Sequence, residues 1–191
     1  RDRLTGTDWD PFGGAAPVAW WKLDEMSGNV AKDYASSSLD GTWNGSGTST
    51  WHSVGKIGMA GEFNGVDDYV DCGNDSSLEN LSEFTYLAWI YPTGWGGSSE
   101  GDVLTKDNAT KELRLRNEGG QKSLRGYATE ARVNAVDNTI TLNKWQHVAM
   151  TYRSDTGYLS LYVNGSEVEY DYRNADTTLG SDAGGNFEIG R

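Results

Sequence analysis

Residues 145–165 constrain the fold of this chain more than any other segment, because they read as two strands joined by a short turn. Leu159, Leu161 and Val163 alternate with polar or aromatic residues, so one face of the second strand is apolar. The Asn-Gly pair at 164–165 favours the positive φ angles of a tight hairpin turn. The segment therefore predicts an antiparallel sheet, with the three aliphatic residues pointing into a core.

The composition extends this prediction to the whole chain. Among 191 residues there are 25 glycines, 8 tryptophans and 10 tyrosines but only 3 prolines, which favours short strands punctuated by glycine turns. No stretch has a convincing amphipathic helical period, and residues 75–81 suit a single helical turn. This length is ordinary for one all-β domain, and it buries enough surface to form a core without disulfides.

The formal net charge of −12 excludes some classes of partner. A nucleic-acid binder needs a basic groove or stripe, and an anionic membrane surface attracts basic segments; neither is present in the sequence. No apolar run reaches 18 residues, so no membrane-spanning helix is predicted. The acidity is compatible with a divalent cation, with neutral or cationic partners, or with solubility alone.

The chain divides into a leading segment and one domain. Residues 1–16 resemble a linker or N-terminal extension, and 18–23 form the first convincing strand. Residues 84–91 are apolar on both faces, which predicts a central strand. Four further segments predict a meander of consecutive strands, at 103–106, 112–116, 122–127 and 131–134. The single cysteine, Cys72, is predicted to be a small buried residue.

Five motifs occur in a fixed order along the chain. They are W-W-K-L-D-E-M-S-G at 20–28, Asp33 with Gly41, F-N-G-V-D-D-Y-V at 63–70, F-T-Y-L-A-W-I at 84–90, and W-x-H-V-A followed by L-x-L-Y-V-N-G within 145–165. Together they resemble the laminin-G-like, concanavalin A-like lectin-glucanase family. The resemblance implies an all-β, two-sheet antiparallel jelly-roll sandwich over residues 17–191.

The sequence departs from the family pattern at its end. Family members continue past a strand like that at 187–191 into one more strand, which the resemblance places next to the first. Without it, the strand at 18–23 is expected to be an unpaired edge, open to an added strand. That strand is expected from residues 1–16, from a second chain, or from a longer parent protein.

The candidate catalytic residues are few. Glycosidases on related folds use two carboxylates at a fixed distance, often in an E-x-D-x-x-E strand, and no such spacing occurs here. Glu167 and Glu169 share a strand face without a third partner, and His147 belongs to a structural motif in which we expect it to be packed. With two histidines and one cysteine, a zinc site is not expected. The chain is therefore predicted not to be an enzyme.

A calcium site is the predicted cofactor. Ca²⁺ prefers six to eight oxygen ligands, and the loop at 24–33 and the turn at 64–68 are rich in them. The resemblance adds to this, because related domains often hold Ca²⁺ near the first loop. The predicted ligands are Asp24, Ser27, Asn29, Asp33 and Asp68. The alternative is a solvated acidic turn in which aspartates accept hydrogen bonds from their own backbone.

A glycan is the predicted ligand, because an exposed aromatic ring packs on the apolar face of a pyranose while amides and charged groups bind its hydroxyls. Trp95 is the first candidate, since flanking glycines leave it without an evident core role. The other candidates are Trp43, Trp51 and Tyr127, with Asn108 and Arg116 as polar partners. The remaining strand tryptophans, Trp20 or Trp21, Trp89 and Trp145, are expected in the core.

These observations predict a non-catalytic, extracellular glycan-binding or adhesion module of a larger surface or secreted protein, with a glycan or cell-surface polysaccharide as partner. One alternative is a structural subunit of a surface layer or filament, assembled through the open sheet edge. A second alternative is a degenerate polysaccharide-degrading enzyme, which requires a carboxylate pair or a Tyr/His/Arg cluster that converges in a cleft.

Overall fold

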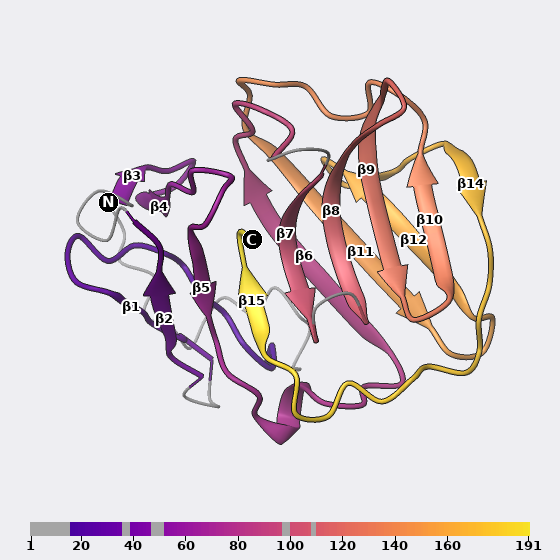
Figure 1. Ribbon diagram of the computed structural model, residues 1–191, viewed down its shortest axis with the longest axis horizontal. Helices are drawn as coiled ribbons and strands as arrows, with labels where there is room; N and C mark the ends of the chain where they lie inside the picture. Colours follow the sequence, from indigo (N-terminus) through magenta and orange to yellow (C-terminus); the bar gives the residue numbers. More distant parts are fainter. Residues whose placement is uncertain (1–15, 36–38, 47–51, 97–99, 108–109) are drawn as a thin grey trace.

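The computed structural model describes residues 16–35, 39–46, 52–96, 100–107 and 110–191. These residues form a nine-stranded, a four-stranded and a two-stranded antiparallel sheet. Strands β7 to β10 of the largest sheet lie in front of β6, β11 and β12 of the four-stranded sheet (Figure 1). The predicted all-β sandwich of two antiparallel sheets is confirmed.

The nine-stranded sheet joins distant parts of the chain. Its order is β1-β2-β5-β15-β7-β8-β9-β10-β14. The strands are β1 (Val30–Ala31), β2 (Gly41–Asn44), β5 (Tyr69–Asp71), β15 (Phe187–Ile189), β7 (Glu100–Lys106), β8 (Lys111–Glu118), β9 (Gln121–Ala128), β10 (Ala131–Ala135) and β14 (Tyr170–Arg173). The predicted meander is confirmed, because β7, β8, β9 and β10 are neighbours in this order.

The four-stranded sheet has the order β13-β12-β11-β6. Its strands are β13 (Ser166–Glu167), β12 (Tyr158–Val163), β11 (Gln146–Arg153) and β6 (Phe84–Ile90), and β3 (His52–Val54) pairs with β4 (Met59–Gly61) in the small sheet. One 3₁₀ turn, η1 (Ser76–Leu78), begins after Asp75, whose carboxylate accepts the Ser77 N–H. The single helical turn expected at 75–81 is thereby confirmed.

The core lies between the two larger sheets. Leu159 and Leu161 are fully buried and Val163 packs against the core, as the alternating pattern predicted. Gly126 of β9 faces them, and a Cβ at this position would lie 2.5 Å from the Met150 sulfur. Glycine is required here because the two sheets approach too closely for any side chain.

The hairpin turn and the cysteine follow the sequence prediction. Asn164 and Gly165 have φ angles of 52° and 83°, the left-handed values of a tight turn. Cys72 is buried next to β5. Burial raises the pKa of its thiol well above the ordinary value, with the neighbouring Asp71 adding to the effect. This cysteine is therefore a packed apolar residue and not a reactive thiolate.

Two strand predictions are wrong. β6 is not central but forms one edge of the four-stranded sheet, because the described residues pair with it only on the β11 side. Trp89 on its outer face is consequently 47% exposed and not in the core. Residues 18–23 have no regular strand, and their one bridge joins Trp21 to Asp33. Trp20 is exposed, whereas Trp21 packs against the core and Trp145 is half-buried.

Across the residues that the structure describes, no helix is long and apolar enough to cross a membrane.

Candidate functional site

The outward face of the nine-stranded sheet carries a group of charged side chains that are linked by ion pairs. In β8, Leu113 and Leu115 point into the core, so Glu112, Arg114 and Arg116 point to the other side. β9 repeats the pattern, with its apolar residues inward and its polar residues outward. Period-two alternation in adjacent strands therefore builds a polar surface, here called the polar face.

Strand register determines which residues meet on the polar face. Residues directly opposite in neighbouring strands share a face, so the pairings assemble cross-strand rows. The rows are Glu188, Thr105, Glu112, Tyr127 and Arg132; then Asp102, Arg114, Arg125, Asn134 and Tyr172; then Glu100, Arg116 and Ser123; and last Glu118 and Gln121.

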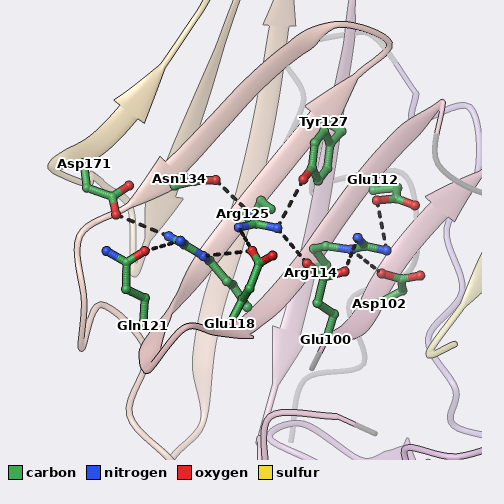
Figure 2. Close-up of polar contacts among 11 residues, drawn as sticks. Glu100, Asp102, Glu112, Arg114, Glu118, Gln121, Arg125, Tyr127, Asn134 and Asp171 are labelled. Atoms are coloured by element: carbon green, nitrogen blue, oxygen red, sulfur yellow. Dashed lines mark hydrogen bonds and ion pairs between the residues drawn. The ribbon is translucent and has the colours of Figure 1, made fainter. Parts of the chain in front are cut away.

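Arg114 lies among three carboxylates (Figure 2). Its guanidinium nitrogens lie 2.5 Å from Glu100, 2.8 Å from Asp102 and 3.1 Å from Glu112. Burial by itself lowers the pKa of Arg114, but the hydrogen bond to Asp102 and the three negative charges outweigh it and raise that pKa. Arg114 is thus held charged and in a fixed orientation.

Glu100 links this group to the next arginine. Arg114 and Arg125 are directly opposite in β8 and β9, an unfavourable position for two like charges. Glu100 compensates for it by binding both, with Oε2 at 2.5 Å from Arg114 and Oε1 at 2.6 Å from Arg125. Arg125 also donates to Asn134 at 2.9 Å and to the Tyr127 hydroxyl at 3.2 Å. All its polar contacts come from the polar face.

The chain of charges ends at β14. Glu118 accepts from Arg125 at 2.8 Å, which lowers the pKa of that carboxyl, and its carboxylate lies 3.8 Å from Arg116. Arg116 in turn contacts Asp171 at 3.2 Å and donates to Gln121. Guanidinium groups and carboxylates therefore alternate across four strands of the sheet.

Glu112 is the carboxyl with the most perturbed titration on this face. Its side chain is 3% exposed, and this burial, together with the charges of Asp102 and Glu100, raises its pKa to about 7. Arg114 and Arg125 act in the opposite direction and do not compensate. The charge of Glu112 consequently changes near neutral pH.

Aromatic rings flank the charges. The guanidinium carbons of Arg114, Arg125 and Arg132 lie 5.7, 5.7 and 5.9 Å from the centre of the Tyr127 ring. Arg132 also lies 4.8 Å from the centre of the Tyr172 ring, which is 45% exposed. Such contacts hold both rings in place by cation–π attraction.

Two hydroxyls on this face have no hydrogen-bond partner within the described ranges. Both Thr105 Oγ1 and Ser123 Oγ are buried. A buried hydroxyl without a partner is costly, so an ordered water is the expected complement.

The sequence-predicted glycan residues have different outcomes. The structure places Tyr127 and Arg116 together on the polar face, one at its centre and the other near β14. Trp51 and Asn108 lie outside the described residues.

Two tryptophans of that set do not present an exposed aromatic ring to a ligand. Trp43 on β2 points inward, is 2% exposed and packs on Phe63 with ring centres 4.8 Å apart. Trp95 is half-buried and packs against the hydrophobic core, so the expectation that it has no core role is wrong. The burial of Trp43 could not be predicted from its polar and glycine neighbours in the sequence, because its partner Phe63 is distant in sequence.

The predicted calcium ligands do not assemble. Asp24 accepts the N–H of Met59 at 2.8 Å, and Asp33 accepts the N–H groups of Trp20, Ala35 and Leu39. Asp68 accepts the Asn64 N–H at 3.1 Å, while Ser27 and Asn29 are exposed. No group of three or more His, Cys, Asp or Glu residues suited to a metal occurs in the part of the chain that the structure describes.

These residues therefore do not fit a calcium ion in the arrangement observed. Asp24 and Asp33 instead accept backbone N–H groups from other segments, at Met59, Trp20 and Leu39, and the bond from Ala35 to Asp33 is of the local kind that the alternative interpretation described.

The polar face also contains residues that the sequence interpretation missed. Glu112, Arg114 and Arg125 were assigned to strands but to no site, and Glu100 and Asp102 lay before the strand predicted at 103–106 and were assigned to no site either. The available signal was the run E-L-R-L-R at 112–116 beside S-L-R-G-Y at 123–127, where charges recur at every second position. Three carboxylates also converge on Arg114, which is one part of what the enzyme alternative requires.

Comparison with known proteins gives the family. Residues 64–191 match the sequence model of the concanavalin A-like lectin/glucanases superfamily. None of the curated protein sequences matches this chain.

Several solved structures show distant similarity to this chain. Domain 4 of AbnA, an extracellular GH43 arabinanase from Geobacillus stearothermophilus solved with arabinotriose, is 18% identical over 87% of this chain and 68% of that one, with a TM-score of 0.47. The carbohydrate-binding module CBM66 from Bacillus subtilis is 15% identical over 86% and 89%, with a TM-score of 0.41.

A proposed carbohydrate-binding protein from Bacteroides ovatus is 23% identical over 61% of this chain, with a TM-score of 0.46. The aligned part is only 32% of that protein's length. The match to the family model, in contrast, extends over more than half of the present chain and includes every strand of the polar face. The chain belongs to the concanavalin A-like lectin/glucanases superfamily.

Proposed function

We propose that this chain is a non-catalytic glycan-binding or adhesion module that acts outside the cell as part of a larger surface or secreted protein. The observation that carries the proposal is the polar face, where fixed guanidinium and carboxylate groups lie beside the rings of Tyr127 and Tyr172. Membership of a superfamily named for lectins and glucanases supports the same substrate class.

The chemistry of the polar face suits a neutral glycan. Sugar hydroxyls both donate and accept, so they match a surface in which arginine donors alternate with carboxylate acceptors. The exposed ring of Tyr172 offers an apolar surface to the C–H face of a sugar. A polyanionic glycan is disfavoured, because six carboxylates accompany four arginines here and the chain has a net charge of −12.

The enzyme alternative has one observation in its favour. The pKa of Glu112 is raised to about 7, and its carboxylate and that of Asp102 both contact Arg114. A glycosidase also uses two neighbouring carboxyl groups, one of them with a raised pKa. However, both bind Arg114, and the Glu112 side chain is only 3% exposed. A carboxyl that is paired and enclosed is better suited to fix arginine than to protonate a bound glycan.

The test is a glycan array followed by calorimetry of the strongest neutral ligand with Tyr172→Ala. We expect this variant to fold normally and to bind about three- to tenfold more weakly, because it loses the stacking surface. Tyr158→Ala is the matched control. The Tyr158 side chain is also exposed (43%), and its ring centre also lies 4.8 Å from an arginine guanidinium carbon, that of Arg173, but Tyr158 belongs to the four-stranded sheet. Its affinity should equal that of the unmodified protein.

Two results would contradict the proposal. Equal losses in Tyr172→Ala and Tyr158→Ala would show that the polar face is not the site. Continuous release of reducing sugar from the bound glycan, abolished by Glu112→Gln, would identify the chain as an enzyme.

A further inference from the structure

We propose that four aromatic side chains on the outward face of the four-stranded sheet form a second site for a neutral glycan. They are Trp89 and Tyr91, at the end of β6, and Trp145 and His147, at the start of β11, and they are called the aromatic array here. Because β7 to β10 lie in front of this sheet in Figure 1, the array and the polar face are on opposite sides of the sandwich. The array is therefore a separate site and does not depend on the polar face.

Strand pairing brings the four rings together. Trp89 has an outward position in the alternating burial of β6. β11 pairs with β6 so that His147 lies opposite Trp89, and the same register places Trp145 opposite Tyr91. The ring centres are 5.5 Å apart in each pair. Positions two residues apart along a strand are separated by about 6.8 Å, so the array consists of two aromatic pairs in successive rows.

The array is open to solvent and uncharged. Trp89 is 47% exposed and Tyr91 is 45% exposed, while Trp145 and His147 are half-buried. Burial lowers the pKa of His147, so its imidazole is neutral at pH 7 and has one donor and one acceptor nitrogen. Rings of this kind pack on the C–H face of a sugar, while their polar edges bind its hydroxyls.

The exposed area of the array fits a small ligand better than a protein. An aromatic side chain contributes a surface of about 150–250 Å², so the exposed parts of Trp89 and Tyr91 amount to roughly 200 Å². A stable protein interface needs about 800 Å² from each partner, and the two rings supply about a quarter of that area. One or two sugar rings, in contrast, are enough to cover them.

The charges near the array favour a neutral ligand. Lys56 Nζ lies 5.6 Å from the centre of the Trp89 ring, and this positive charge opposes a cationic ligand at the same ring. The net charge of −12 opposes a polyanionic glycan. Asn164 borders the same row, where its side-chain oxygen accepts the His147 N–H at 3.0 Å. Lysine and asparagine side chains both carry N–H donors that suit sugar hydroxyls.

The ring angles indicate which form of glycan fits. The planes of Trp89 and His147 differ by 66°, and those of Tyr91 and Trp145 differ by 57°. Each pair therefore presents a ring face next to a ring edge, which is not the flat surface that a crystalline polysaccharide needs. Because the two pairs lie in successive rows, the expected ligand is a soluble chain whose consecutive sugar units follow the direction of β6.

The test follows the indole N–H signals of the isotope-labelled full chain by nuclear magnetic resonance. The probes are three neutral hexasaccharides at millimolar concentration: cellohexaose, mannohexaose and maltohexaose. We expect the Trp89 and Trp145 signals to shift with at least one of them. The signals of Trp21 and Trp43 should not shift, because both rings pack in the core.

Three variants locate the site. Trp89→Ala should weaken binding of that hexasaccharide about three- to tenfold, as read from the Trp145 signal, while an unchanged Trp43 signal shows that the fold is intact. Tyr158→Ala is the matched control, because Tyr158 is 43% exposed on the same outward face but lies outside the array. Tyr172→Ala changes only the polar face and should leave the affinity of the array unaltered. This variant separates a failure of the array from a failure of the polar face.

Three results would overturn the proposal. The first is the absence of any shift of the Trp89 and Trp145 signals with all three hexasaccharides. The second is an equal loss of affinity in Trp89→Ala and Tyr158→Ala, or loss of the Trp89 shift in Tyr172→Ala, because either result means that the array is not a separate site. The third is tighter binding of the cationic hexamer of glucosamine than of cellohexaose, which would mean that the array selects positive charge.

Discussion

The buried ion pair between Lys111 and Asp182 offers the sharpest test of how the interior is held together. Lys111 Nζ lies 2.6 Å from Asp182 Oδ2, and the two side chains are 1% and 0% exposed. The second oxygen of Asp182 accepts the N–H of Asn80 at 2.5 Å, and Lys111 lies 5.4 Å from the centre of the Phe84 ring. One carboxylate therefore connects β8, the loop before β6 and the segment before β15.

The expected magnitude follows from competing terms. At 2.6 Å and an effective dielectric constant of about 20, the attraction is about 6 kcal/mol, but removing each ion from water costs several kcal/mol. The pair is thus close to neutral in net free energy. Asp182→Asn keeps the acceptor for Asn80 but leaves Lys111 charged and unpaired, and we expect a loss of about 3–5 kcal/mol. The double variant Asp182→Asn with Lys111→Met should lose at least 2 kcal/mol less, because no charge remains unpaired.

The assay is urea unfolding at pH 7, followed by tryptophan fluorescence. Asp155→Asn is the control, since the Arg153–Asp155 pair has the same 2.6 Å separation but side-chain exposures of 67% and 55%, and its loss should stay below about 1 kcal/mol. A loss below about 1 kcal/mol for Asp182→Asn, or a double variant whose loss equals the sum of the single losses, would refute the reasoning.

The same pair predicts a pH dependence. Burial by itself raises the pKa of Asp182, but hydrogen bonds from Lys111 and Asn80 outweigh it and hold that pKa below the ordinary value. A carboxyl with a lowered folded-state pKa stabilises the fold above its unfolded pKa of about 3.9. This contribution should disappear as the pH falls through the lower folded-state value, and Asp182→Asn should lack it.

Three further outcomes are expected. Glu112→Gln should stabilise the protein at pH 8 by up to about 3 kcal/mol and by less near pH 5. The reason is that the folded-state pKa of Glu112 is raised to about 7, so its ionised form destabilises the fold increasingly as the pH rises from about 4.5 through 7. Equal effects at both pH values in urea unfolding would contradict this. Leu161→Ala should cost about 2–5 kcal/mol in the same assay, and a loss below about 1 kcal/mol would mean that this residue does not face the core. Chelator should leave the melting temperature unchanged, since the acidic loop residues bind backbone amides, and a higher melting temperature in millimolar Ca²⁺ would restore the calcium hypothesis.

The sequence predicted those features that short-range patterns determine. Leu159 and Leu161 reach the core because alternation in a strand fixes the face on which a side chain lies. The turn at Asn164 and Gly165 needs positive φ angles that few residue types adopt readily. Asp75 caps a 3₁₀ turn through a hydrogen bond to an amide two residues away. Each of these depends on neighbours within a few positions.

The failures have a common physical cause, which is contact between distant segments. Trp43 reads as a polar-loop residue, yet it is buried against Phe63, twenty positions later in the sequence. Asp33 reads as a metal ligand, yet its carboxylate binds backbone amides at positions 20, 35 and 39. Trp89 reads as a core residue, yet β6 is paired on one side only in the described structure. The local sequence pattern predicts on which face of a strand a side chain lies, but it does not predict which distant segment packs against that face.

The polar face combines both situations. Alternation alone places Arg114 and Arg125 on the outward side of their strands, so the face of the sheet on which they lie was predictable. Their neighbours were not, because register determines that the two arginines lie opposite one another and that Glu100 lies between them. A shift of one residue between β8 and β9 would place Arg114 opposite an inward position and separate the charges. The glycan-binding proposal therefore depends on strand register more than on any single residue, and the hairpin loop between β8 and β9, with Gly119 and Gly120 at φ angles of 61° and 84°, fixes that register.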